Sequence, residues 1–454
     1  MALYGYDLFH KGTIALSEVE SNGIRVDVKY CKRKRRELLL EAGMLDTEIQ
    51  GSKAGKLWAK HFGAKTNYNS RQQLAKVLFG LMGHVSVIKT ATGKDSASEE
   101  ALAKVDDPVA KWFLISQKLK KCANTYLDNI ILNTTKGILH PFFHLHFAAS
   151  YRSSSSEPNF QNFPVRDEFI GKLIREAFRA RPGRCLVEVD YSAIEVRVAA
   201  CYHKDPTMLE YINDPTKDMH SDMASECFMI PKDQVTKEIR YFGKNCFVFP
   251  QFYGSVYQQC APSLWEARPL EMKNGMTIGE HLMYIKGIHK LGTCSFDKDT
   301  KKGTFEDHIR KVSDNFWNVR FPVYSQWKRK WYSDYLETGE FHSLTGFKYW
   351  GIFHKNQVIN YPIQGSAFHC LLLALIYLQR AIRKHHKRTL IVGQIHDSIV
   401  ADVPENEMEW YLDMVQKIMV DKVGRAYSWL IVPLEVEAEA SGVEGTWYEK
   451  ERVL

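Results

Sequence analysis

Two aspartates stand at positions where carboxylates can hold a divalent cation. Asp190 follows the apolar, β-branched run from Cys185 to Val189, which predicts that a strand ends there. Asp397 lies between two further apolar runs, at the expected tip of a hairpin. If the strands are neighbours, the carboxylates converge, and they repel each other unless a metal ion neutralises them. That arrangement suits Mg²⁺ and two-metal phosphoryl transfer, although either aspartate alone is more typical of a helix cap or a turn.

A second group of residues has the chemistry to bind a triphosphate and a base. Arg240 and Lys244 lie four residues apart, on one face of a predicted helix. A guanidinium can clamp phosphate there, and an ammonium adds a point charge. Phe249 and Tyr253 repeat the spacing and offer a surface on which a base can stack. An amphipathic helix with solvated basic residues has the same pattern, so the spacing alone does not distinguish a triphosphate-binding site from an ordinary helix surface.

These side chains need a small sheet, built from distant segments, inside a mostly helical body. Strands are expected at residues 185–189 and on both arms of the hairpin at 390–403, and residues 351–360 are expected to be irregular or strand-like. Helices are expected within 7–30 (ending at Asn22-Gly23), through most of 31–135 and 206–345, and from Pro362 to about Lys384.

The composition is that of an ordinary globular chain. Of 454 residues, 45% are apolar and 25% are charged, which excludes a disordered or collagen-like chain. No apolar run approaches the roughly 20 residues of a membrane-spanning helix, and the first residues do not resemble a secretory signal. Nine scattered cysteines without a CxxC pair indicate reduced thiols, so we expect a cytoplasmic protein. The formal charge of +8 fits either a slightly basic soluble protein or one that binds a polyanion.

Taken in order, the motifs resemble those of the family A DNA polymerases. Asp190 to Arg197 (DYSAIEVR) resembles motif A of that family, and Gln394 to Asp397 (QIHD) resembles motif C. The pattern from Arg240 to Gly254 resembles motif B on the fingers helix of the family. Three further stretches are similar to family motifs: Gly23 to Asp27 (GIRVD), Arg152 to Asn162 (RSSSSEPNFQN) and Asn360 to Ser366 (NYPIQGS).

The resemblance implies an α+β right-hand fold, with palm, fingers and thumb arranged around a small antiparallel palm sheet. The implied divisions are palm at 1–30, thumb at 31–135, palm at 136–205, fingers at 206–345 with an insertion near 255–305, and palm at 346–454. The implied activity is DNA-directed DNA synthesis. Primer-template DNA and dNTPs are the implied ligands, replication accessory proteins are further candidate partners, and a monomer without membrane contact is expected.

The resemblance also implies a role for each candidate residue. Asp190 and Asp397 are expected to be catalytic and to hold two Mg²⁺ ions, for which Mn²⁺ can substitute. The residues expected to contact the dNTP are Arg240, Lys244, His220, Phe249, Tyr253 and Glu195. The residues expected to contact primer or template are Arg152, Asn159, Gln161, Asn162, Asn360, Gln364 and His396.

The sequence departs from the family pattern at four positions. The glutamate that usually follows the motif C aspartate is Ser398, so a third carboxylate is not expected there. Ala193 replaces a glutamine, and Tyr151 replaces the glycine before Arg152. Motif B has one extra residue between Lys244 and Phe249, followed by a proline. One residue turns a regular helix by about 100°, so a π-bulge or a proline kink is needed to keep the two on one face.

Other functions compete with the leading interpretation. A single-subunit RNA polymerase shares the palm and the Arg-x3-Lys helix, but it carries a small residue where this chain has Glu195. A non-catalytic nucleic-acid-binding protein would not need both aspartates, and a two-metal nuclease would not need a triphosphate-binding helix. The match begins by Gly23, so we expect no exonuclease domain in this chain, and its compactness suggests a phage or another mobile replicon.

Overall fold

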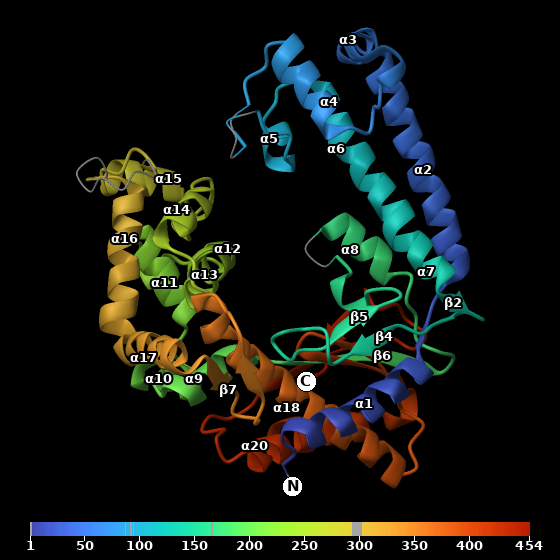
Figure 1. Cartoon of the computed structure of the whole chain (residues 1–454), viewed down its shortest axis with the longest axis vertical. Coiled ribbons are helices and arrows are strands. Elements are labelled where there is room, and N and C mark those ends of the chain that lie inside the picture. The colour runs from blue at the N-terminus through green and yellow to red at the C-terminus, as the bar shows by residue number, and fades with distance from the viewer. Residues whose placement is uncertain (1, 87, 91–92, 94, 165–166, 293–301) are drawn as a thin grey trace.

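The computed structural model describes the chain except for residues 1, 87, 91–92, 94, 165–166 and 293–301. Figure 1 shows a body at the base, which holds both ends of the chain, and two lobes that rise from it on opposite sides. The body contains the largest sheet, whereas both lobes are helical. The expectation of a mostly helical α+β chain with a small antiparallel sheet is therefore confirmed.

The sheet of the body has five antiparallel strands drawn from three distant parts of the chain. Their order is β12-β11-β6-β10-β9. The expected hairpin at residues 390–403 and the expected strand at 185–189 are both present, and the strand is longer than predicted. The strands are β6 (Arg184–Tyr191), β9 (Leu390–Ile395), β10 (Ser398–Pro404), β11 (Val436–Ser441) and β12 (Lys450–Arg452).

Helix α18 (Lys355–Lys384) is the central helix of the body. It contacts α1 (Gly5–Asn22), α9 (Ile194–His203) and strand β10. Its length and composition would suit a membrane span, but 89% of its most apolar stretch is buried inside the protein. The run from Cys370 to Gln379 is buried throughout, because the helix is enclosed by other elements on every side. It is therefore a core helix.

The prediction that this helix begins at Pro362 is wrong, and so is the irregular structure expected through residue 360. The helix begins at Lys355, and Pro362 lies inside it. A proline within a helix leaves the carbonyl four residues before it without a donor. Here that carbonyl belongs to Val358, and it accepts a hydrogen bond of 3.1 Å from the indole Nε1 of Trp331. A neighbouring helix thus supplies the missing bond, and the proline is accommodated.

The lobe at the upper right of Figure 1 is built on two long helices that pack side by side. A separate cluster of buried residues, which includes Trp58, Leu78 and Phe113, forms the core of its far end. The expectation of mainly helical structure in 31–135 is confirmed for the described residues. The helices are α2 (Val28–Gly51), α3 (Lys53–Phe62), α4 (Arg71–Ala75), α5 (Glu99–Ala103), α6 (Pro108–Lys121) and α7 (Asp128–Leu132), with π-helical turns at Lys76–Leu81 and Cys122–Leu127.

The lobe at the left also has its own core, around Phe228, Phe247 and Phe316. Residues 293–301 of the expected insertion near 255–305 lie outside the described residues. The helices that follow α9 in this lobe are α10 (Pro206–Asn213), α11 (Met219–Phe228), α12 (Lys237–Phe242), α13 (Phe249–Phe252), α14 (Tyr257–Trp265), α15 (Ile278–Glu280), α16 (Phe305–Asn315) and α17 (Pro322–Thr338), with π-helical turns at Gly243–Val248, His281–Ile285 and Phe316–Arg320.

Short elements join the lobes to the body. Gly23 ends α1 with a φ of +55°, and a side chain there would collide with the Leu139 carbonyl at 2.6 Å, so the predicted Asn22-Gly23 breaker is required by a close approach.

The remaining strands are β1 (Ile24–Arg25), β2 (Thr134–Thr135), β3 (Ile138–Leu139), β4 (Phe142–His144), β5 (Ser154–Ser156), β7 (Glu340–His342) and β8 (Lys348–Trp350). The remaining helices are α8 (Glu168–Arg175), α19 (Met408–Val415) and α20 (Val423–Ala426), with a π-helical turn at Gln416–Lys422.

Candidate active site

The two predicted aspartates come together at one end of the central strands. Ser398 is the direct cross-strand partner of Asp190, and the Tyr191 amide donates to the Asp397 carbonyl at 3.3 Å. Asp397 lies in the tight turn between β9 and β10, as expected from the sequence. Burial raises the pKa of Asp190, and the negative charges of Asp397 and Glu188 raise it further. Two carboxylates in this position favour a shared cation.

The donor set fits a hard cation that takes oxygen ligands, with two carboxylates rather than three. Among the described residues, no group of three or more His, Cys, Asp or Glu side chains is placed to hold a metal ion. Ser398 stands where the family has a glutamate, and its hydroxyl donates to Glu188 at 3.2 Å. Burial alone would raise the pKa of Glu188, but its ion pair with Lys450 lowers it. The Glu188 carboxylate is thus ionised and already has a lysine partner.

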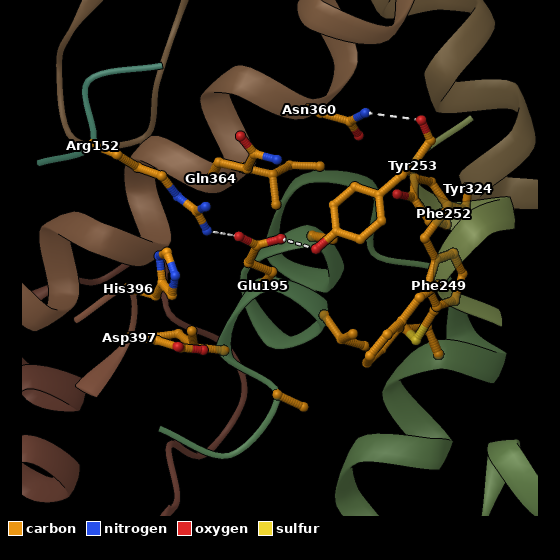
Figure 2. A pocket seen from close by; sticks show the side chains of 16 residues that line it. Arg152, Glu195, Phe249, Phe252, Tyr253, Tyr324, Asn360, Gln364, His396 and Asp397 are labelled. Carbon is orange, nitrogen blue, oxygen red and sulfur yellow. Dashed lines mark hydrogen bonds and ion pairs between the residues drawn. The ribbon is translucent and has the colours of Figure 1, made fainter. Parts of the chain in front are cut away.

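A cavity of about 490 Å³ opens beside Asp397, between the body and the left lobe. Figure 2 shows side chains from several distant segments pointing into it. Sequence reasoning predicted half of its lining, and the structure brings these residues together: Arg152, Glu195, Phe249, Tyr253, Asn360, Gln364, His396 and Asp397.

Glu195 is held from both sides across this cavity. Its carboxylate forms an ion pair with Arg152 and accepts a hydrogen bond of 2.5 Å from the Tyr253 hydroxyl. The Asn360 amide in turn donates to the Tyr253 carbonyl at 3.3 Å. Burial lowers the pKa of Arg152 and raises that of Tyr253. The side chains therefore form one bridge that spans the cavity from the body to the left lobe.

The extra residue in the helix of Arg240 to Tyr253 is absorbed by a π-helical turn. The turn spans Gly243–Val248, between α12 and α13. Because a π-helix spaces its bonds five residues apart, Lys244 and Phe249 stay on one face. The Lys244 ammonium lies 5.2 Å from the centre of the Phe249 ring. The π-bulge anticipated from the sequence is therefore present, and Pro250 enters the first turn of α13.

The predicted phosphate-binding residues gather next to Phe249, just outside the cavity lining. The His220 ring meets the Phe249 ring edge-on at 5.7 Å. Arg240 is held by Asp218, with Nε 2.6 Å from its carboxylate, and Asp218 also caps α11. Burial and the charges of Arg240 and Lys244 lower the pKa of His220 to about 4, so the ring is neutral at pH 7. The three side chains predicted to bind phosphate thus lie together on the left lobe.

Three predicted DNA contacts lie apart from the cavity lining. Asn159 and Asn162 are exposed at the ends of a 3₁₀ turn, whereas Gln161 between them is 8% exposed. The Gln161 amide donates to the Gln394 side chain at 2.7 Å and to the Ser153 hydroxyl at 2.8 Å. Gln161 therefore braces the strand that leads to Asp397.

Tyr324 and Phe252 line the cavity although no motif pointed to them. Phe252 lies three residues after Phe249, a spacing that shares a helix face, so this spacing was a usable signal. Tyr324 comes from α17, and its ring lies behind Tyr253 and Phe252 in Figure 2. It is 71 residues beyond Tyr253 in the chain, and nothing in its sequence neighbourhood distinguishes it from a core aromatic residue.

A sequence profile places most of the chain in one known family. The profile described as DNA polymerase family A matches residues 41–283 and 327–449. DNA polymerase I of Chloroflexus aurantiacus is 29% identical over 447 residues, which cover 96% of this chain and 43% of that protein. The thermostable DNA polymerase I of Thermus aquaticus is 28% identical, over 95% of this chain and 46% of that protein. The chain thus spans less than half the length of these relatives.

A solved structure has a similar fold. It is the POL domain of Pol1 from M. smegmatis in complex with DNA primer-template and dNTP. The superposition gives a TM-score of 0.74 at 25% identity and covers 97% of this chain and 70% of that one. The predicted α+β right-hand polymerase fold is thereby confirmed. The relatives named here are bacterial, so a phage origin stays a prediction.

Proposed function

The chain belongs to DNA polymerase family A, and on that premise we propose that it extends a DNA primer by template-directed addition of deoxynucleotides, with release of pyrophosphate. One observation carries the proposal. Asp190 and Asp397 converge at the rim of a cavity that also holds Glu195 and Tyr253, and the cations Arg240 and Lys244 lie next to it. A carboxylate pair beside donors for phosphate is the arrangement that phosphoryl transfer needs.

Each group of residues has a proposed task. Two Mg²⁺ ions held by Asp190 and Asp397 would activate the primer 3′-hydroxyl and stabilise the leaving pyrophosphate. Arg240, Lys244 and neutral His220 bind the triphosphate, and Phe249 stacks beside the incoming base. The residues proposed to contact primer or template are Arg152, Asn159, Asn162, Asn360, Gln364 and His396. Gln161 is proposed to act indirectly, through its hydrogen bond to Gln394.

The bridge of Arg152, Glu195 and Tyr253 sets the shape of the nucleotide site. Because Glu195 is held from two sides, its position under the sugar is fixed before the nucleotide arrives. A fixed carboxylate leaves no room for a 2′-hydroxyl, so the site selects deoxyribose. Selection of deoxyribose by Glu195 favours a DNA polymerase over a single-subunit RNA polymerase.

We assign the body to the palm (1–30, 136–205 and 346–454), the right lobe to the thumb (31–135) and the left lobe to the fingers (206–345). Three clusters of buried residues support the assignment, because one is centred in the body, one in the left lobe and one at the far end of the right lobe. The cluster of the body also takes in the base of the right lobe, where α2 and α6 join it. Primer-template DNA and dNTPs are the proposed ligands, as named for the M. smegmatis structure. We propose a monomer that works in the cytoplasm.

Primer extension by the purified chain tests the proposal. We expect extension with dNTPs and Mg²⁺ or Mn²⁺, little with rNTPs, and none in EDTA. Preferential use of rNTPs would favour the RNA polymerase alternative. Binding of primer-template without extension under any of these conditions would favour a non-catalytic nucleic-acid-binding protein.

A further inference from the structure

Helix α17 carries a row of alternating aromatic and basic side chains that starts at the cavity. Tyr324, Lys328 and Tyr332 follow one another at four-residue spacing and so lie on one face of the helix. Tyr324 lines the cavity, and the Lys328 ammonium is 5.3 Å from the centre of its ring. The ammonium of Lys355, at the start of α18, is 5.8 Å from the centre of the Tyr332 ring. We call these four residues the α17 row.

The cations of the row lack an acidic partner. Among the described residues, neither Lys328 nor Lys355 forms an ion pair, and the same holds for the adjacent Arg329. Lys330 on the same helix, by contrast, is 2.9 Å from the Asp334 carboxylate. Lys328 instead rests on the Trp317 ring, 2.9 Å from its centre. Burial and the charges of Lys355 and Arg329 lower its pKa to about 7. A desolvated cation without an anion is costly, so the row favours an anionic ligand from outside.

The alternation of rings and cations selects the kind of anion. Single-stranded nucleic acid is bound by surfaces that combine backbone-binding cations with aromatic rings. Trp350 in strand β8 is 66% exposed, and the carbonyl of the next residue, Gly351, accepts a hydrogen bond of 2.7 Å from the Tyr335 hydroxyl of α17, so a further exposed ring lies near this helix. A compact anion would be bound by donors that converge on one point, whereas these side chains are spread along a line.

The position of the row indicates which strand it meets. A side chain at Gly254 would lie 2.4 Å from Asn356, so the chain just beyond Tyr253 touches the first turn of α18, next to Lys355. Arg240 and Lys244, proposed for the triphosphate, precede Phe249 and Tyr253 in the same helical stretch. The row therefore lies on the far side of Tyr253 from Arg240 and Lys244. It is next to the end of the nucleotide site that is opposite the triphosphate.

We propose that the α17 row binds the unpaired template strand ahead of the templating base. This inference rests on the proposed function, because only a template-directed enzyme has such a strand at this site. The ammonium groups of Lys328 and Lys355 contact its phosphates, and the partly exposed ring of Tyr332 and the exposed ring of Trp350 take its bases, whereas Tyr324 is 2% exposed and supports Lys328 from below. The row thereby keeps the single strand extended as it approaches Tyr253.

The test compares two primer-templates that differ only in the length of the 5′ overhang. One has a single unpaired template nucleotide, and the other has about ten, within the range such surfaces cover. The variants are Lys328→Met, which keeps an apolar stem against Trp317, and the exposed Lys355→Met. Lys330→Met on the same helix is the matched control. Fluorescence anisotropy at several salt concentrations gives Kd and the salt slope, and circular dichroism checks folding.

We expect Lys328→Met and Lys355→Met each to weaken binding of the long-overhang substrate by roughly threefold or more and to reduce its salt slope by about one. The short-overhang substrate and Lys330→Met should be unaffected. Equal weakening on both substrates, or unchanged binding by Lys355→Met, would overturn the proposal.

A labelled single strand of the same length, without a primer, separates this inference from the proposed function. If the wild-type chain extends primers but both row variants bind the long overhang normally, the inference fails and the proposed function stands. If the chain extends no primer but both variants still weaken single-strand binding, the proposed function fails. The row then remains a single-strand-binding surface without a template.

Discussion

The Lys244 ammonium lies over the Phe249 ring, at 5.2 Å, although the two residues are five apart in the chain. In a regular α-helix an offset of five places side chains on different faces, whereas the π-helical turn at Gly243–Val248 brings them together. The turn thus keeps the cation proposed to bind phosphate next to the ring proposed to stack on the base, despite the extra residue.

We predict that removing Asn245 is tolerated and that adding a residue is not. Deletion gives Lys244 and Phe249 a four-residue offset, which an α-helix keeps on one face. An alanine inserted after Asn245 instead rotates the two apart by about 100°. We expect dNTP KM within about threefold of wild type for the deletion and at least roughly tenfold higher for the insertion, which corresponds to about 1.4 kcal/mol. Equal KM values for the two variants would show that the turn does not set this geometry.

Replacing either convergent aspartate should abolish catalysis without abolishing DNA binding. Asp190→Asn and Asp397→Asn should each slow single-nucleotide incorporation by ~10³-fold or more, or about 4 kcal/mol of barrier. Primer-template Kd should change little, because Lys and Arg contacts to phosphate dominate binding. Rapid-quench incorporation and anisotropy measure the two effects. Asp413→Asn, in an exposed ion pair with Lys417, is the matched control. Near-normal incorporation by either active-site variant would contradict the assignment.

Shortening Glu195 should admit ribonucleotides. Glu195→Ala removes the carboxylate held between Arg152 and Tyr253, and with it the barrier that we propose it forms under the sugar. We expect relative use of rNTPs to rise by roughly tenfold or more, or about 1.4 kcal/mol, while dNTP use falls less. Competitive primer extension with one rNTP and its dNTP measures the ratio.

Tyr253→Phe provides the control for that prediction. It removes one of the two contacts to Glu195 and leaves the Arg152 ion pair in place. Discrimination against rNTPs should therefore be largely kept. A greater loss in Tyr253→Phe than in Glu195→Ala would mean that the tyrosine, and not the carboxylate, excludes the 2′-hydroxyl.

Stability should fall on mild acidification because of buried neutral histidines. Burial lowers the pKa of His369 to about 3, and in the unfolded chain it is about 6.5. Between these values the unfolded state binds a proton that the folded state does not, so stability is full above pH 6.5 and falls as pH decreases. The loss for one histidine approaches ~1.4 kcal/mol per pH unit. Urea unfolding at pH 7.5 and about pH 5.5 should show lower stability at the acidic value.

His369→Gln should reduce this pH dependence by about one proton, or roughly 1 kcal/mol across that range. A glutamine can still donate to the Tyr151 carbonyl and accept from Thr345, as the histidine does. His386→Gln, at an exposed position, should leave the dependence unchanged. Identical pH dependence in all three proteins would rule out His369 as its source.

The sequence predicted the elements whose signals are local. The β-branched runs around Asp190 and Asp397 identified the strands, and the motif order indicated that the carboxylates meet. The register that places Ser398 opposite Asp190 could not be read from it, because pairing depends on segments more than 200 residues apart. The interior position of Pro362 was missed for the same reason, since the indole that satisfies the freed carbonyl belongs to another helix.

Tyr151 shows how packing offsets a locally unfavourable residue. It adopts a φ of +57°, where the family has glycine, and this conformation costs a non-glycine residue of order 1 kcal/mol or more. Its ring packs 4.8 Å from that of Phe347 and 4.9 Å from that of Tyr349, and His369 holds its carbonyl. The sequence showed the substitution but not these contacts. Arg152 next to it is thereby presented to Glu195.

Helix α2 belongs to two cores at once. Its first half packs into the body through Cys31 and Leu38, and its last turn packs into the far core through Ile49. A helix of 24 residues is about 36 Å long, and it is a stiff rod with α6 along its side. Mechanically it is a lever. A tilt of 10° at its base would swing the far end by roughly 6 Å, so a displacement of about an ångström near the body is amplified several-fold at the far end of the proposed thumb.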